Sequence, residues 1–214
     1  MLPAMLKSIT SADATRRRGR DTREEILSCA EALWQGRGYN GFSYHHIAIQ
    51  LGIRNAAIHY HFPSKENLGV ALIQRYRARF AEWFVEVRKI ELAWQRLHRY
   101  FDLYLDYLNA ECRVCPSGIL GAEFQAIPEE MRAEAKLLMG EIYDWLIETL
   151  NLGRQQGSLK FIGNAEDKAV EIGASLQGGL QIARVAGAER LHQLLAQMSL
   201  ELFGENAAAV AQAA

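Results

Sequence analysis

The 214-residue chain is 50% hydrophobic and 23% charged, which permits a substantial buried core and excludes an intrinsically disordered protein. Its three cysteines and four prolines argue against a secreted disulfide framework and a fold of short strands. The net charge of −1 is unevenly divided, since residues 1–89 hold 14 basic and 8 acidic side chains, which suggests a polyanionic partner for the front of the chain.

The N-terminal third predicts a basic arm followed by three helices. Residues 1–20 include Arg17 and Arg18 and are too charged to pack. We expect a flexible arm that adds contacts to phosphates or a minor groove, with an inert tail as the alternative. Apolar residues recur at helical spacing over about 22–35, and glycines follow at 36 and 38. Two short helical patterns then occupy 44–51 and 55–61.

Six further helices are predicted in the rest of the chain. Ser64 and Asn164 are expected to cap two of them, and Gly157 to end another. The expected ranges are 64 through the eighties, about 91–110, 117–127, 128–156, 165–186 and 188–203. These patterns predict an all-α chain of about nine helices. Residues 21–67 would form a three-helix head, 68–204 a larger helical body, and 205–214 a frayed tail.

Residues 43–68 carry the pattern of a helix-turn-helix. Ser43 can cap the first helix, and Gly52 suits the turn because glycine adopts positive φ at little cost. The second helix is polar where it would project outward into a major groove. Asn55 could read adenine, and Arg54 could read guanine or hold a phosphate. The alternative is an ordinary helical hairpin with a histidine-rich surface.

The run from Ile58 to Glu66, IHYHFPSKE, resembles the signature that closes the DNA-binding head of the TetR/AcrR family. An RxxILxxAxxLxxxxGY-like first helix, from Arg23 to Tyr39, and an IAxxxGI core over 47–53 are also similar to that family. The close match covers about residues 20–70. It implies a sequence-specific transcriptional regulator that binds a double-stranded DNA operator, a repressor released by a small-molecule effector.

The resemblance also implies roles for single residues. Ser43, Tyr60 and Lys65 would hold phosphates, and Asn55 and Ala56 would face bases. Arg54, Ala56, Ala57 and His59 depart from the residues usual in the family, so the operator sequence is not predicted. The full set of expected DNA contacts is Arg17, Arg18, Ser43, Tyr44, Arg54, Asn55, Ala56, His59, Tyr60, His61 and Lys65.

In this family the C-terminal part forms the dimer and holds the effector. The last helix carries an apolar stripe, and the preceding helix carries small residues: Leu191, Leu194, Leu195, Met198 and Leu202, then Gly173, Ala174, Gly178, Gly179 and Ala183. These faces predict a homodimer through a four-helix bundle, or else they complete the core of one chain. The expected effector-binding residues are Tyr104, Tyr107, Leu108, Cys115, Ile119, Glu123, Phe124, Trp145 and Gln177.

Two cysteines, Cys112 and Cys115, form a single CxxC. A zinc site needs two more ligands and no second pair exists, so we expect no metal and no cofactor. Cys115 lies beside Pro116 in an interrupted segment, and the alternative function is a redox- or electrophile-responsive regulator acting through its thiol. An inert packing role is the simpler interpretation.

Other classes of protein find little support in the sequence. The histidines at 45, 46, 59 and 61 lack an adjacent carboxylate, and no glycine-rich phosphate loop or HExxH is present, so an enzyme is not expected. A helical scaffold that binds only proteins is the remaining alternative. Residues 1–15 lack the apolar core of a signal peptide, and no stretch approaches the roughly 20 apolar residues of a membrane span. We expect a cytoplasmic protein without membrane contact.

Overall fold

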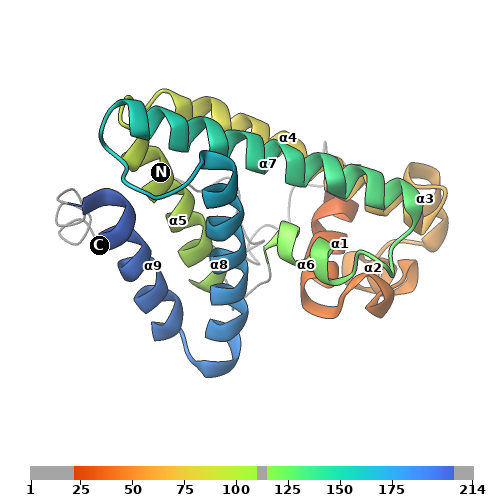
Figure 1. The fold of residues 1–214 in the computed structure, drawn as a ribbon. Helices are drawn as coiled ribbons and strands as arrows, with labels where there is room; N and C mark the ends of the chain where they lie inside the picture. The colour runs from red at the N-terminus through yellow and green to blue at the C-terminus, as the bar shows by residue number, and fades with distance from the viewer. Residues whose placement is uncertain (1–21, 110–114, 205–214) are drawn as a thin grey trace, which may run out of the picture. The chain divides into compact units, whose positions relative to one another are not determined.

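The computed structural model describes residues 22–109 and 115–204, and every element within these two stretches is helical (Figure 1). The expected all-α class is confirmed for this part of the chain. None of the helices described there is long and apolar enough to cross a membrane. Arg17, Arg18, Cys112 and the tail at 205–214 lie outside the described residues.

Helix boundaries agree closely with the sequence pattern except at one place. The short helix expected over 117–127 ends at Ala122, and turns follow to Ile127 because Ala126 and Ile127 both donate to the carbonyl of Glu123. The elements are α1 Thr22–Arg37, η1 Tyr39–Gly41, α2 Tyr44–Leu51, α3 Asn55–His61, α4 Lys65–Arg88, α5 Ala93–Asn109, α6 Pro116–Ala122, α7 Glu129–Gln155, α8 Ala165–Ala186 and α9 Glu189–Phe203.

Two compact units make up the described chain, and both use parts of α4 and α7. The first unit holds the described residues up to Ala78 together with Pro116–Leu138. The second unit holds the described residues of Arg79–Cys115 and those from Met139 onward. The boundary at residue 67 expected from the sequence assigns α6 to the helical body and stays a prediction. By packing, α6 belongs to the compact unit that contains α1–α3.

Local sequence sets several helix ends. The Asn164 side chain accepts from the Asp167 N–H at 2.7 Å and caps α8. At the start of α4, Ser64 Oγ accepts from the Asn67 N–H at 3.1 Å, and the Asn67 side chain accepts in return from the Ser64 N–H. Gly157, just after α7, has a φ of 66°. The two expected caps and this glycine end are confirmed.

Helices α8 and α9 lie side by side in the second unit (Figure 1). Gly179 lies against the side chains of Leu191 and Leu194, and Gly173 lies against the ring of Tyr143. The α9 residues Leu191, Leu195, Met198 and Leu202 are buried within the single chain. Leu194 is half-buried. The burial of the other four residues favours the alternative in which the stripe completes the core of one chain, and the four-helix dimer stays a prediction.

Two glycines of α7 provide a matched test of this packing. A Cβ at exposed Gly140 would meet open space, whereas a Cβ at buried Gly153 would meet the side chain of Leu159. Gly140→Ala should raise the free energy of unfolding by about 0.5–1 kcal/mol, because alanine favours the helix. Gly153→Ala should lower it by about 1–2 kcal/mol through overpacking. Denaturant unfolding measures both, and stabilisation by both substitutions would contradict the described packing.

Candidate nucleic-acid interface

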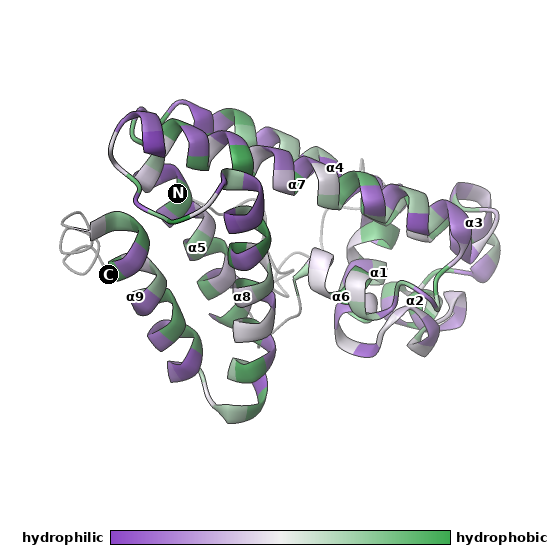
Figure 2. Ribbon diagram, in the orientation of Figure 1, coloured by the Kyte–Doolittle hydropathy of each residue, from purple (hydrophilic) through white to green (hydrophobic). Residues whose placement is uncertain are grey.

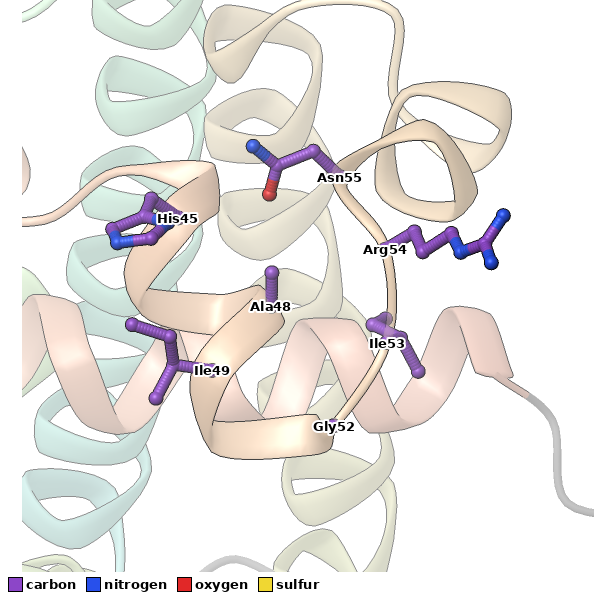
Figure 3. A pocket seen from close by; sticks show the side chains of 7 residues that line it. All are labelled: His45, Ala48, Ile49, Gly52, Ile53, Arg54 and Asn55. Atoms are coloured by element: carbon purple, nitrogen blue, oxygen red, sulfur yellow. The ribbon is translucent and has the colours of Figure 1, made fainter.

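An open hollow of about 450 Å³ lies where α2 meets α3 (Figure 3). Its walls come from α2, from the turn and from the first residue of α3: His45, Ala48, Ile49, Gly52, Ile53, Arg54 and Asn55. In Figure 3 the Arg54 side chain extends away from the other labelled side chains. The lining thus combines apolar side chains with the hydrogen-bonding groups of His45, Arg54 and Asn55.

The turn between α2 and α3 is built by Gly52. Its φ of 65° is left-handed, and the Ile53 N–H donates to the Ala48 carbonyl at 3.1 Å, which closes the end of α2. Ile47 and Ile58, one on each helix, are completely buried and hold the pair together. This geometry leaves Arg54 and Asn55 exposed at the start of α3, as the sequence pattern predicts.

Most of the predicted DNA contacts lie at the surface of the first unit. Tyr60 stands out, because 84% of its surface is exposed although its ring is large and apolar. His61 is half-buried. The exposed members of the predicted set are Ser43, Arg54, Asn55, Ala56, His59 and Tyr60. These side chains are accessible at the surface, but their contacts with DNA stay predictions.

The His46 side chain bonds to Ser43 at the start of α2. Its Nδ1 accepts from the Ser43 N–H at 3.0 Å, and the Ser43 hydroxyl lies 3.3 Å from the same atom. Since Nδ1 accepts, the neutral ring carries its proton on Nε2. Ser43 therefore precedes α2 in a fixed conformation, with its hydroxyl exposed beside the first amides of the helix.

Tyr44 has an internal position, contrary to the expectation that its side chain meets DNA. The ring is buried, and its hydroxyl donates to the Phe62 carbonyl at 2.8 Å. Burial raises the pKa of this phenol to about 12, so the hydroxyl stays a donor at neutral pH. Tyr44 joins α2 to the segment after α3 and acts from inside the first unit.

The Lys65 side chain also forms hydrogen bonds within the first unit. Its Nζ donates to the carbonyls of Tyr39 and Phe42, at 2.5 and 2.7 Å, and lies 4.4 and 4.6 Å from the centres of their rings. Burial lowers the pKa of Lys65, and the negative charge of Glu123 opposes that shift. Two of the three ammonium protons are used in this way, which leaves one for the phosphate contact expected from the sequence.

Glu123 forms its hydrogen bonds within the first unit, whereas the sequence suggested an effector contact. Its carboxylate accepts from Trp34 Nε1 at 2.7 Å and from the Tyr39 N–H at 2.9 Å. Gly38 has a φ of 76°, and a Cβ there would collide with the same carboxylate. No local pattern signals this contact, because Tyr39 and Glu123 are 84 residues apart.

The expected effector-binding residues divide between the two units. Cys115, Gln177 and Tyr104 come together in the second unit, where the thiol donates to Gln177 Oε1 at 3.1 Å and Gln177 Nε2 donates to the Tyr104 hydroxyl at 3.4 Å. Tyr107, Leu108 and Trp145 belong to the same unit, whereas Ile119, Glu123 and Phe124 belong to the first.

Cys115 is only 2% exposed. Burial and the bond to the neutral amide of Gln177 are typical of a packing residue, because a reactive cysteine needs access. No observation therefore favours the redox function over ligand binding. Among the described residues, no cluster of histidine, cysteine or acidic side chains could hold a metal ion.

Sequence reasoning missed two residues of the hollow, His45 and Ile49. Both are exposed, and Ile49 shows 67% of its surface. Their spacing of one helical turn was the available signal, since residues four apart share a face of the helix.

Tyr44, which is buried, and Tyr60, which is exposed, provide a matched test of these two positions. Tyr44→Phe should lower the free energy of unfolding by about 1–3 kcal/mol, because the buried Phe62 carbonyl loses its donor. Tyr60→Phe should leave it within about 0.5 kcal/mol, because that hydroxyl is at the surface. Denaturant unfolding of both variants measures the difference, and equal losses would contradict the internal bond of Tyr44.

Two family models and several relatives match the chain. Residues 26–72 match bacterial regulatory proteins, tetR family, and residues 93–198 match the tetracyclin repressor-like C-terminal domain. The HTH-type transcriptional repressor NemR of Escherichia coli is 28% identical over 171 residues, which are 73% of this chain and 83% of NemR. These relatives are transcriptional regulators rather than enzymes.

Solved structures agree with this match. A TetR-family regulator from Agrobacterium tumefaciens is 32% identical with a TM-score of 0.78, covering 82% of this chain and 94% of its own. A TetR regulator from Legionella pneumophila is 31% identical with a TM-score of 0.72, covering 84% of this chain and 98% of its own. The resemblance read from IHYHFPSKE is confirmed, and the chain belongs to the tetR family of bacterial regulatory proteins.

Proposed function

We propose that this transcriptional regulator represses by binding its operator as a dimer through α2, the turn and α3, and that a small effector bound in the second unit releases it. The observation that carries this proposal is the exposed start of α3 beside the hollow. Arg54 and Asn55 present there the two side chains best suited to base edges, a guanidinium and an amide.

The proposal assigns separate tasks to several of the predicted contact residues. Asn55 reads an adenine through two hydrogen bonds, and Arg54 reads a guanine or holds a phosphate. Ser43, Tyr60 and the third ammonium proton of Lys65 bind phosphates, which fix the position of α3 without reading sequence. The arm with Arg17 and Arg18 adds further phosphate contacts.

Operator selection from random DNA tests these separate tasks. Asn55→Ala should change the preferred base at one position of each half-site, at a cost of about 1–3 kcal/mol for the original base pair. Tyr60→Phe should weaken binding to all sequences while leaving the selected operator unchanged, because a phosphate contact carries no sequence information. An unchanged selection with Asn55→Ala would remove this residue from base reading.

The dimer surface in this proposal is an exposed face of α8. Val170 and Ile182 are more than half exposed, and Ala174 and Gly178 lie between them at four-residue spacing. Such a ridge with small residues at its centre allows a second helix to approach closely. Val185, at the end of the helix, is 91% exposed. A second copy of the chain would cover this face. Hydrophobic residues recur along α8 in Figure 2.

Ile182→Lys tests the dimer, because it places a charge on this ridge. We expect the variant to sediment as a monomer at micromolar concentration and to lose affinity for a two-half-site operator by at least tenfold. Ile162→Lys is the matched control, since Ile162 is 96% exposed and lies outside α8. A dimeric Ile182→Lys variant would place the interface elsewhere.

Release requires that the effector bind more tightly to a form of the dimer whose heads are wrongly spaced for the operator, because equal affinity for both forms shifts nothing. Helices α4 and α7 contribute residues to both units. A change in the second unit that shifts either helix therefore reaches the first.

A further inference from the structure

Three aromatic side chains gather around Trp145 in the second unit and form a cluster of four with it. The ring of Trp83 lies 5.1 Å from that of Trp145, Phe84 stacks on it at 5.3 Å, and Tyr100 approaches at 5.4 Å. All four side chains are buried. They come from α4, α5 and α7, so the cluster depends on three helices packing together.

Three polar atoms of this region have no hydrogen-bond partner in the described part of the chain. Within the described residues, no hydrogen-bond partner lies near Nε1 of Trp83, Nε1 of Trp145 or Oγ1 of Thr149, and all three atoms are buried. Thr149 follows Trp145 by one turn of α7, so both share a face of that helix. The indole of Trp34, in contrast, donates to Glu123.

A buried N–H without an acceptor is costly, and native proteins leave few of them. An indole nitrogen can only donate, so rotation of the ring does not satisfy it with another donor. The rings of Trp83 and Trp145 are in contact, and the Thr149 hydroxyl lies one helical turn from Trp145. A bound molecule that supplies acceptor atoms would explain all three polar groups together.

The surroundings restrict the chemistry of that molecule. Tyr100 and Tyr104 hydroxyls lie 3.5 Å apart, and burial raises the pKa of both, so they stay neutral. The cluster itself contains no side chain charged at neutral pH, so nothing in it neutralises a carboxylate or a phosphate. A cation would be attracted by the ring faces but would leave the indole N–H groups without an acceptor.

We propose that this cluster binds the effector, and that the effector is an uncharged, flat, largely apolar molecule whose carbonyl oxygen accepts from the indole N–H groups of Trp83 and Trp145. Its entry separates rings that now touch, and ring–ligand contacts of the same kind replace those lost. The word effector rests on the function proposed above, whereas the binding site can be measured on the protein alone.

The test uses the full-length protein without DNA. Three ketones of increasing size serve as probes, acetophenone, 2-acetonaphthone and fluorenone, each paired with the hydrocarbon in which carbon replaces the oxygen. The chain has four tryptophans, so its ¹⁵N spectrum contains four indole N–H signals, which single Trp→Phe variants assign. Trp34, already bonded to Glu123, is the internal control.

We expect at least one ketone to shift the Trp83 and Trp145 signals saturably while the Trp34 signal stays in place. That ketone should bind about tenfold more tightly than its hydrocarbon, the effect of one added hydrogen bond. Trp145→Phe should remove this preference, whereas Phe84→Leu should weaken both ligands and keep it. Equal binding of each ketone and its hydrocarbon, or no saturable shift with any ketone, overturns the proposal.

Operator binding of the same samples separates this site from the proposed function. If a ketone shifts both indole signals but leaves operator affinity unchanged, the binding site is supported and its role in release is contradicted. A ketone that releases the operator without moving either signal overturns the site and leaves ligand-controlled release standing.

Discussion

The ammonium of Lys65 donates to the carbonyls of Tyr39 and Phe42 and lies over the rings of the same two residues. Helices α2 and α3 run between Phe42 and Lys65 along the chain, so this contact closes the helix-turn-helix at its base. A charged donor satisfies two carbonyls and two ring faces at once, which makes the closure stronger than a neutral bond would. The exposed positions of Arg54 and Asn55 depend on it, since they lie within the closed segment.

A second contact holds the same loop from a distant part of the chain. Glu123 accepts from the N–H of Tyr39, whose carbonyl accepts from Lys65, so one residue of η1 is fixed on both sides. Gly38 makes this possible, because it leaves room for the carboxylate and adopts a left-handed φ. The DNA-binding unit is therefore completed by the segment after α6, and a boundary drawn from the N-terminal motif alone omits part of it.

The second unit contains two regions that are packed differently. Its α8–α9 core is closed by small residues such as Gly179, which leave no space for a Cβ. Its aromatic cluster, in contrast, keeps the indole nitrogens of Trp83 and Trp145 without a partner among the described residues. Buried polar groups in a protein core are almost always hydrogen-bonded, and the exceptions concentrate at functional sites. One unit thus holds both a tightly packed scaffold and a region of unused hydrogen-bonding capacity.

The sequence by itself determined the helices, the caps at Ser64 and Asn164, the turn at Gly52 and the family, because each is encoded in residues a few positions apart. Only the tertiary structure decided that Tyr44 and Lys65 turn inward, that Glu123 bonds to Tyr39, and that most of the α9 stripe is buried within one chain. It also ended α6 at Ala122, earlier than periodicity predicts. The physical reason is that helical spacing specifies which face is apolar, whereas the partner of each face depends on residues far away along the chain.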